Sequence, residues 1–251
     1  MPNKLSKSVA LLALAAFLPL SLTSCSSDAD QTEPATDNTG GSESSEQTEQ
    51  PEPEPEPVYV QAPLTGISYL ENSNPFLEGP ALNVKIDNFP PARPQTAIGS
   101  ADIVYVQRVE GGITRFVAIW HSQIPEVFGP MRSVRPMDPN IVSPYGGIFA
   151  YSGGQDPFIF ASLDTGLYNA YEDSEVGLET LFRREGTGKP YEHTLYGRGT
   201  LLVESHSELE PPTPHLNYVP EADKSLVSTA NGTEFDYFEI TYKEATSRWD
   251  V

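Results

Sequence analysis

The sequence predicts a mixed α+β domain in which helices flank a central mixed or antiparallel sheet, and a disordered linker precedes this domain. Residues 81–87 alternate apolar and polar side chains with the period of a half-buried strand. Two runs rich in β-forming residues follow, and short segments of strand and helix character then alternate over residues 138–163. Strands first, with mixed strands and helices afterwards, are typical of this fold class.

The two β-rich runs cover residues 102–109 and 113–121, and they are separated by Glu110-Gly111-Gly112. We expect them to form a hairpin, because glycine readily adopts the backbone conformations that tight turns require. Both faces of the second run are largely apolar, which predicts a central strand. Further predicted elements are a short helix over 138–145, a buried strand over 148–151, a helix over 156–163 and a strand over 235–242.

The amino terminus has the pattern of a bacterial export signal. Lys4 and Lys7 precede an apolar run of about 14 residues, which is shorter than the ~18 to 20 residues that span a bilayer. Small residues precede Cys25, the only cysteine, as in the lipobox of bacterial lipoproteins. We therefore expect residues 1–24 to be a signal peptide and Cys25 to carry the lipid anchor. An ordinary secretory signal with a chance cysteine is the alternative.

Residues 25–61 are predicted to be the lipid anchor followed by a disordered, acidic and Pro-rich linker. Ten acids lie between Asp28 and Glu56, and a composition so polar cannot bury enough apolar surface to fold. We expect this linker to tether a main globular domain of residues 62–222 at the outer, extracytoplasmic face of the cytoplasmic membrane. Residues 223–251 would begin a smaller carboxy-terminal domain, which we expect to be truncated here.

A cationic region interrupts an otherwise acidic chain. The net charge of −20 disfavours a nucleic-acid binder, which needs a basic surface. Residues 85–135 nevertheless contain six bases and four acids. Because the planar guanidinium group binds phosphate and carboxylate bidentately, we expect Arg115, Arg132 and Arg135 to form a pocket for an anionic group. Candidate ligands are phosphate-bearing envelope polymers, peptide carboxylates of the wall, or an acidic segment of a partner protein.

Two structural alternatives to this pocket stay open. Arg132 and Arg135 could pair with the protein's own carboxylates. Arg115 lies in an otherwise apolar strand face and needs a partner if it is buried, for which Asp87 and Glu110 are the natural candidates. In the binding hypothesis, the same two carboxylates orient the arginines. A purely structural envelope scaffold, with every charge internally paired, is the third reading.

An enzyme is the rival from another class, and the sequence leaves open whether the protein is one. A cell-envelope hydrolase or transferase would use Glu110 or His121 as its general base. In addition, residues 150–154 (AYSGG) loosely resemble a nucleophile elbow between a predicted strand and a predicted helix. The corresponding triad would consist of Ser152, either Asp164 or Asp173, and His193.

The sequence predicts neither a metal nor a cofactor. No two histidines have the spacing of a zinc motif. Residues 186–190 (GTGKP) are not a phosphate-binding loop, because proline replaces the Ser or Thr that would reach magnesium.

Five blocks in order resemble the YerB-like lipoproteins, a bacterial family assigned to domain of unknown function 3048. The blocks are residues 84–88 (VKIDN), 92–95 (ARPQ), 101–105 (ADIVY), 109–116 (VEGGITRF) and 129–135 (GPMRSVR), with a looser block at 191–196 (YEHTLY). The resemblance implies a membrane-anchored lipoprotein with a main amino-terminal domain and a smaller carboxy-terminal one, and it implies no established activity. The family's recognisable polar positions correspond here to Asp87, Arg93, Glu110, Arg115, Arg132, Arg135 and His193. Of these, we expect Arg93 and His193 to join Asp87 and the three pocket arginines in binding the ligand.

Overall fold

The computed structural model describes residues 55–218, 233, 235–242 and 245–250. The predicted signal peptide, Cys25, most of the linker and the predicted start of the carboxy-terminal domain lie outside the described residues. Within the described ranges, no helix has both the length and the apolar character needed to cross a bilayer.

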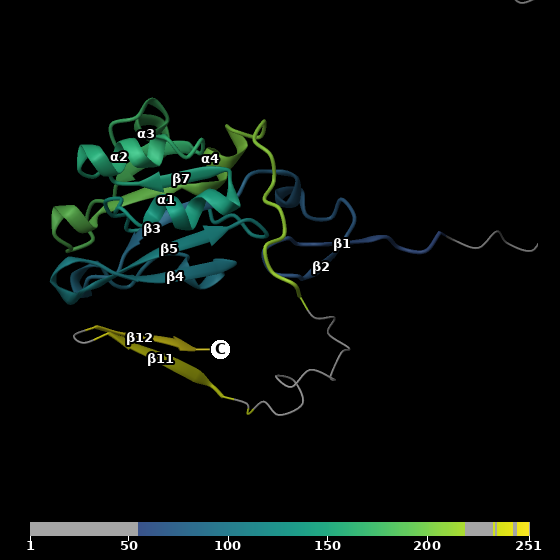
Figure 1. Ribbon diagram of the computed structural model, residues 1–251, viewed down its shortest axis with the longest axis horizontal. Helices are drawn as coiled ribbons and strands as arrows, with labels where there is room; N and C mark the ends of the chain where they lie inside the picture. Colours follow the sequence, from purple (N-terminus) through teal and green to yellow (C-terminus); the bar gives the residue numbers. More distant parts are fainter. Residues whose placement is uncertain (1–54, 219–232, 234, 243–244, 251) are drawn as a thin grey trace, which may run out of the picture. The chain divides into compact units, whose positions relative to one another are not determined.

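A five-stranded mixed sheet forms the centre of the domain, with the strand order β4-β5-β3-β7-β8. β5 pairs antiparallel with both β4 and β3, whereas β3, β7 and β8 run parallel. Figure 1 shows β4, β5 and β3 side by side. The prediction of a mixed sheet in an α+β fold is confirmed. The strands are β3 (Leu82–Asp87), β4 (Ile103–Arg108), β5 (Thr114–Trp120), β7 (Ile148–Tyr151) and β8 (Tyr168–Tyr171).

β4 and β5 form the predicted hairpin, and the turn between them is the short 3-10 segment Glu110–Gly112. Gly111 has a φ of 71°, a left-handed conformation that favours glycine. β5 is fully buried, as predicted for a central strand. The prediction of a half-buried β3 is wrong, because all six of its residues are buried. β3 is the middle strand, so elements cover both of its faces and its polar residues must find partners inside the protein.

Helices and a second sheet enclose the central sheet from its two faces. α1 (Asp138–Val142) and α2 (Asp156–Leu163) pack on the face that carries Val117, Ile119 and Phe149. The opposite face, with Val84 and Trp120, packs against a mixed layer. That layer consists of α3 (Glu175–Thr180), α4 (Gly199–Glu204) and the antiparallel strands β6 (Val127–Phe128), β10 (Leu195–Arg198) and β9 (Leu181–Arg183).

Two separate hairpins complete the described strands. The first pairs β1 (Tyr59–Gln61) with β2 (Ser68–Leu70), so the prediction of linker up to residue 61 is wrong for its last three residues. The second pairs β11 (Tyr237–Tyr242) with β12 (Ala245–Asp250), and β11 starts two residues after its predicted start. The domain boundary at residue 222 stays a prediction.

One irregular segment, residues 130–134, decides the architecture around the site, and we call it the crossing segment. β3 and β7 pair from Leu82 to Val84 and from Ile148 to Ala150, and beyond these positions the crossing segment lies between the two strands. On the β3 side, Asp87 N donates to Pro130 O (2.9 Å) and Arg132 N donates to Lys85 O (2.9 Å). On the β7 side, the amide of Ser152 donates to Arg132 O (3.1 Å). The crossing segment therefore brings Arg132 to the carboxyl ends of two parallel strands.

Candidate functional site

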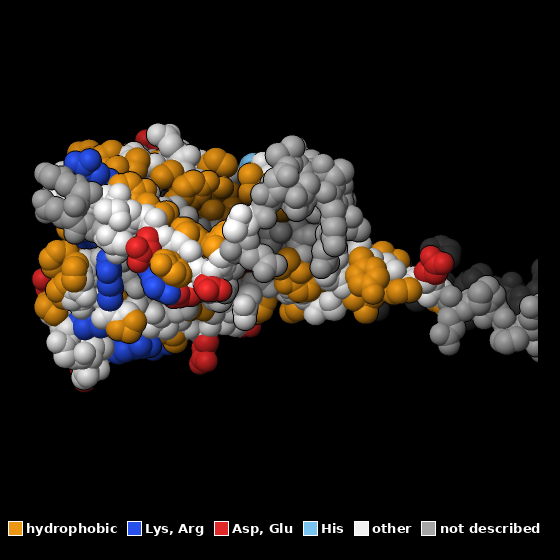
Figure 2. All heavy atoms as spheres, turned by 90° about the horizontal axis from the view of Figure 1, so that it is seen from below, with side chains coloured by type: hydrophobic (Ala, Val, Ile, Leu, Met, Phe, Trp, Pro, Cys, Tyr) orange, Lys and Arg blue, Asp and Glu red, His pale blue; other side chains and the backbone are white. Residues whose placement is uncertain are grey.

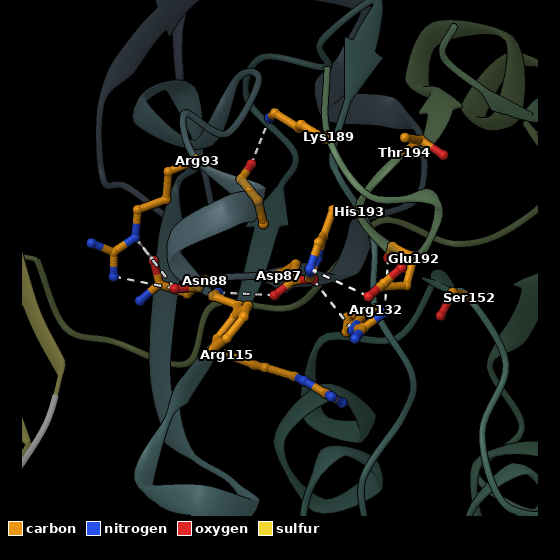
Figure 3. Close-up of polar contacts among 12 residues, drawn as sticks. Asp87, Asn88, Arg93, Arg115, Arg132, Ser152, Lys189, Glu192, His193 and Thr194 are labelled. Carbon is orange, nitrogen blue, oxygen red and sulfur yellow. Dashed lines mark hydrogen bonds and ion pairs between the residues drawn. The ribbon is translucent and has the colours of Figure 1, made fainter. Parts of the chain in front are cut away.

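The charged residues of the predicted pocket meet at the carboxyl ends of β3 and β7. Ligands of open α/β sheets commonly bind outside the carboxyl ends of parallel strands, where neighbouring connections diverge. Here, the crossing segment fills that position and carries two of the arginines on its backbone or directly after it. Figure 3 shows Asp87, Arg132 and His193 directed toward one another at this edge of the sheet.

The Asp87 carboxylate is the centre of the cluster, and only 1% of the residue is exposed. Its Oδ2 accepts from His193 Nδ1 (2.7 Å) and pairs with Arg132 Nε (3.3 Å). Its Oδ1 accepts from the Phe89 amide (2.9 Å). This buried carboxyl group therefore has its hydrogen-bonding capacity satisfied by three donors, and it fixes the positions of all three.

Arg132 is oriented by two different oxygens. Besides its contact with Asp87, its NH1 group donates to the main-chain oxygen of Glu192 (2.8 Å). Its side chain keeps 26% of its surface exposed. The remaining guanidinium N–H groups can therefore reach a ligand without breaking either contact.

Arg115 is the buried charge without a carboxylate. Its NH1 donates to the main-chain oxygen of Ser133 (2.9 Å), and its Nε has no hydrogen-bond partner among the described residues. It forms no ion pair within that part of the chain, although only 6% of the residue is exposed. Burial, followed by repulsion from Arg135 and Arg132, lowers the pKa of Arg115 to about 10.

The expectation that Arg115 pairs with Asp87 or Glu110 is therefore wrong. Arg115 and Asp87 are cross-strand neighbours in the sheet, but Asp87 pairs with Arg132 and His193 instead. Glu110 pairs with Arg135 Nε at 2.8 Å. Arg132 and Arg135 each pair with one of the protein's own carboxylates, as the structural alternative in the sequence analysis describes.

Arg135 approaches the same oxygen as Arg115. Its NH1 lies 3.4 Å from Ser133 O and 3.0 Å from Val134 O. Two guanidinium groups thus converge on one main-chain carbonyl, and one carboxylate, that of Glu110, accompanies them. Two positive charges therefore have one negative partner, which leaves a local excess of positive charge. The two guanidinium groups also repel each other, because they lie in a poorly solvated environment.

A buried ion pair supports the cluster from within the sheet. Lys85 Nζ donates to Asp138 Oδ1 (2.7 Å) and to Gln107 Oε1, and Asp138 Oδ2 accepts from the Arg135 amide (2.7 Å). Burial lowers the pKa of Lys85 to about 8, against the opposing attraction of Asp138. Asp138 is not among the site residues predicted from the sequence. An acid at the start of a predicted helix is nevertheless a recognisable feature, because negative charge is stabilised there.

Two predicted residues, Arg93 and His121, lie apart from this cluster. Arg93 donates to the oxygens of Asn88, and Figure 3 places it beyond Asn88, away from Arg132 and His193. His121 is completely buried and follows the far end of β5, about 20 Å from Arg115 at ~3.3 Å per residue. Its Nε2 lies 3.1 Å from Gly79 O, and burial lowers its pKa.

The predicted serine triad does not form, because His193 pairs with an aspartate other than the two expected ones. Ser152 does lie between β7 and α2, as a nucleophile elbow requires. Its hydroxyl is 3.5 Å from that of Ser133, and within the described ranges it forms no hydrogen bond with His193. His193 is held by Asp87 rather than by Asp164 or Asp173.

No group of three or more His, Cys, Asp or Glu residues within the described part of the chain is arranged to hold a metal ion. The charged residues of the site are instead mixed in sign, since Arg132 pairs with Asp87 and Arg135 pairs with Glu110. Figure 2 shows that Lys and Arg side chains on the face in view gather toward the left, the end of the sheet where β5 begins in Figure 1.

Residues 64–211 match the family described as protein of unknown function (DUF3048), N-terminal domain. The chain belongs to this family. The match covers more than half of the chain and lies within the predicted main domain, so the resemblance seen in the sequence is confirmed.

A curated protein and a solved structure, both from Bacillus subtilis, carry the name YerB. The chain is 40% identical over 94 residues to the protein named "Putative lipoprotein YerB" of Bacillus subtilis (strain 168), covering 38% of this chain and 28% of that protein. The crystal structure of the YerB protein from Bacillus subtilis matches with a TM-score of 0.52 and 29% identity, over 64% of this chain and 56% of that one. The chain therefore spans less than two thirds of the length of that protein and of that structure.

Replacing Asp87 by Ala should strongly destabilise the domain. The substitution leaves Arg132, His193 and the Phe89 amide without their acceptor, and breaking a buried charged contact in this way costs about 3 to 5 kcal/mol. Urea denaturation of the full chain measures the loss. The matched control, Asp173→Ala, removes an exposed aspartate and should change the free energy of unfolding by less than about 0.5 kcal/mol. Equal effects of the two substitutions would contradict the central position of Asp87.

Proposed function

We propose that the protein is a membrane-anchored extracytoplasmic lipoprotein whose folded domain binds an anionic group of the cell envelope or of a partner protein. The binding residues are Arg115, Arg132 and Arg135, at the carboxyl ends of β3 and β7. Asp87 orients Arg132 and Glu110 orients Arg135, through the ion pairs described above.

The convergence of Arg115 and Arg135 on Ser133 O is the observation that carries this proposal. A charge without a counterion is costly to bury, so a guanidinium that is only 6% exposed and has no carboxylate is destabilising in the free protein. A bound anion supplies the missing counterion and an acceptor for the unpartnered N–H groups. Binding of an anion should therefore stabilise this domain more than it would stabilise a protein whose arginines are exposed at the surface.

The geometry gives less support to an enzyme that uses Glu110 or His121 as general base. The hydrogen bond from Arg135 lowers the pKa of Glu110, and a more acidic carboxyl is a weaker base. His121 is fully buried at the other end of β5 and faces a backbone carbonyl. Neither residue combines basicity with access to the arginine cluster.

The membrane anchor is proposed from the sequence of the leader. Cys25 follows small residues at the end of a short apolar run, and the acidic tract behind it separates the folded domain from the membrane. The name of the Bacillus subtilis relative supports a lipoprotein. Two acyl chains on Cys25, of which palmitate is a typical component, give the stable anchoring that one chain does not.

Cys25→Ser should abolish lipid attachment. In a bacterial host fed labelled palmitate, the wild-type chain should carry the label and sediment with membranes, whereas Cys25→Ser should carry no label. Ser27→Ala is the matched control and should behave as wild type. A labelled Cys25→Ser protein would exclude Cys25 as the lipidation site.

Arg115→Met separates binding from structural support. Because it removes a buried charge without a carboxylate partner, we expect an unchanged or higher melting temperature without ligand, and no further rise with inorganic phosphate. Wild type should gain about 2.7 kcal/mol of stability at a phosphate concentration of ~100 times Kd. Thermal unfolding of the full chain in detergent measures both effects.

The control for this experiment is Arg93→Met, which lies outside the cluster and should retain the phosphate response. If Arg115→Met instead lowers the melting temperature and the phosphate response survives, Arg115 is structural. If no anion stabilises wild type, the proposed binding function fails.

A further inference from the structure

Gln107 has a buried side-chain amide of which only one half has a partner. The residue lies on β4, and only 6% of it is exposed. Its Oε1 accepts from Lys85 Nζ, whereas its Nε2 is buried and has no hydrogen-bond partner among the described residues. Most buried polar atoms in proteins are paired with another group of the protein or with ordered water, and an exception needs a physical reason.

Lys85 determines which end of this amide is left over. An ammonium group has only donors, so the atom of Gln107 that faces Lys85 must be the amide oxygen. Lys85 is itself held in place, because it is fully buried and donates to Asp138 Oδ1 at 2.7 Å. The amide nitrogen of Gln107 is consequently the end that remains for another partner.

A second buried donor without a partner belongs to the residue directly opposite Gln107. Gln107 and Arg115 are cross-strand partners on β4 and β5, so their side chains lie on the same face of the sheet. The β-carbons of such pairs are roughly 5 Å apart. Arg115 Nε is also buried and has no hydrogen-bond partner within the described ranges. Two unpartnered N–H groups therefore belong to neighbouring side chains.

The partner that these two groups lack must be an acceptor, because both groups are donors. A water molecule would accept from both groups, but it would leave the buried guanidinium of Arg115 without an anion in contact. Asp87 and Glu110 already pair with other arginines. An anionic oxygen from a ligand satisfies the donors and also supplies the opposite charge.

We propose that Gln107 is a further ligand-binding residue of the anion site, in which Gln107 Nε2 and Arg115 Nε both donate to the bound anion. This assignment rests on the anion-binding function proposed above. It adds a neutral donor, held in a fixed orientation by Lys85, to the charged residues of the site.

Gln107→Glu tests this contact, because it replaces the amide donor by an acceptor with little change in shape. Glutamate can still accept from Lys85, but it has no donor and places a negative charge beside Arg115. We expect the affinity of the full chain for inorganic phosphate, measured by isothermal titration calorimetry in detergent, to fall at least ~10-fold. Without phosphate, the melting temperature should stay the same or rise, because the new carboxylate gives Arg115 a counterion.

Gln123→Glu is the matched control. It adds the same charge to an exposed glutamine beyond the far end of β5, and it should leave the phosphate affinity within about twofold. An equal loss of affinity in Gln123→Glu would be an effect of net charge on the whole domain and would overturn the assignment of Gln107.

Nitrogen-15 NMR of the side-chain amides distinguishes a direct contact from the effect of the added charge. In the wild-type chain, the Nε2–H resonances of Gln107 should shift saturably on titration with inorganic phosphate, while those of Gln123 stay in place. If Gln107→Glu loses affinity but the Gln107 resonances of wild type do not move, the new carboxylate acts through Arg115 alone, and the proposal is wrong. The NMR titration also decides the matter if Gln107→Glu does not fold, because it uses the wild-type chain.

The outcomes also separate this proposal from the function on which it rests. If wild type binds phosphate and Arg115→Met does not, while Gln107→Glu binds as tightly as wild type, Gln107 is not a ligand-binding residue and the proposed function stands. If no anion binds to wild type, both proposals fail.

Discussion

The buried carboxylate of Asp87 is the interaction on which the site depends. It lies at the carboxyl end of the central strand β3 and accepts from His193, Arg132 and the Phe89 amide. These donors come from three stretches of chain that are far apart in sequence. Because a carboxylate is costly to bury without partners, Asp87 requires all three stretches to meet at one point.

This requirement explains why Arg115 has no carboxylate partner. Arg115 is the direct cross-strand neighbour of Asp87, yet the crossing segment supplies Arg132 to the same carboxylate and the 3-10 segment Tyr191–His193 supplies His193. Glu110, the other nearby acid, pairs with Arg135. The excess positive charge is therefore a consequence of how the carboxylates are shared, and it lies where parallel strands commonly bind ligands.

Local patterns in the sequence predicted much of the fold. The β4–β5 hairpin, β7 and α2 follow from alternation, glycine turns and apolar runs, which are properties of a few adjacent residues. The burial of β3 did not follow from its pattern, since Lys85 and Asp87 look like a solvated face. They are buried because Asp138 and His193, 53 and 106 residues further along the chain, provide their partners. Single-sequence reasoning has no access to such distant pairs.

The site residues were predicted by type but not by pairing. Arg115, Arg132, Asp87 and His193 do lie together, because the crossing segment and the 3-10 segment Tyr191–His193 meet at the carboxyl end of β3. Arg93 and His121 do not join them, since Arg93 bonds to the oxygens of Asn88 and His121 Nε2 lies against Gly79 O. Glu192 carries no signal in the sequence, because its contact with Arg132 is made by its main-chain oxygen.

The central claim is that the Arg115 guanidinium lacks a counterion in the free protein and receives one from an anionic ligand. Nitrogen-15 NMR of the arginine side chains tests it directly, because the Nε–H resonance responds to a new hydrogen-bond acceptor. On titration with inorganic phosphate, the Arg115 resonance should shift saturably, while that of Arg93 stays in place. An Arg115 resonance that does not move at any phosphate concentration, in a chain that remains folded, would contradict the account.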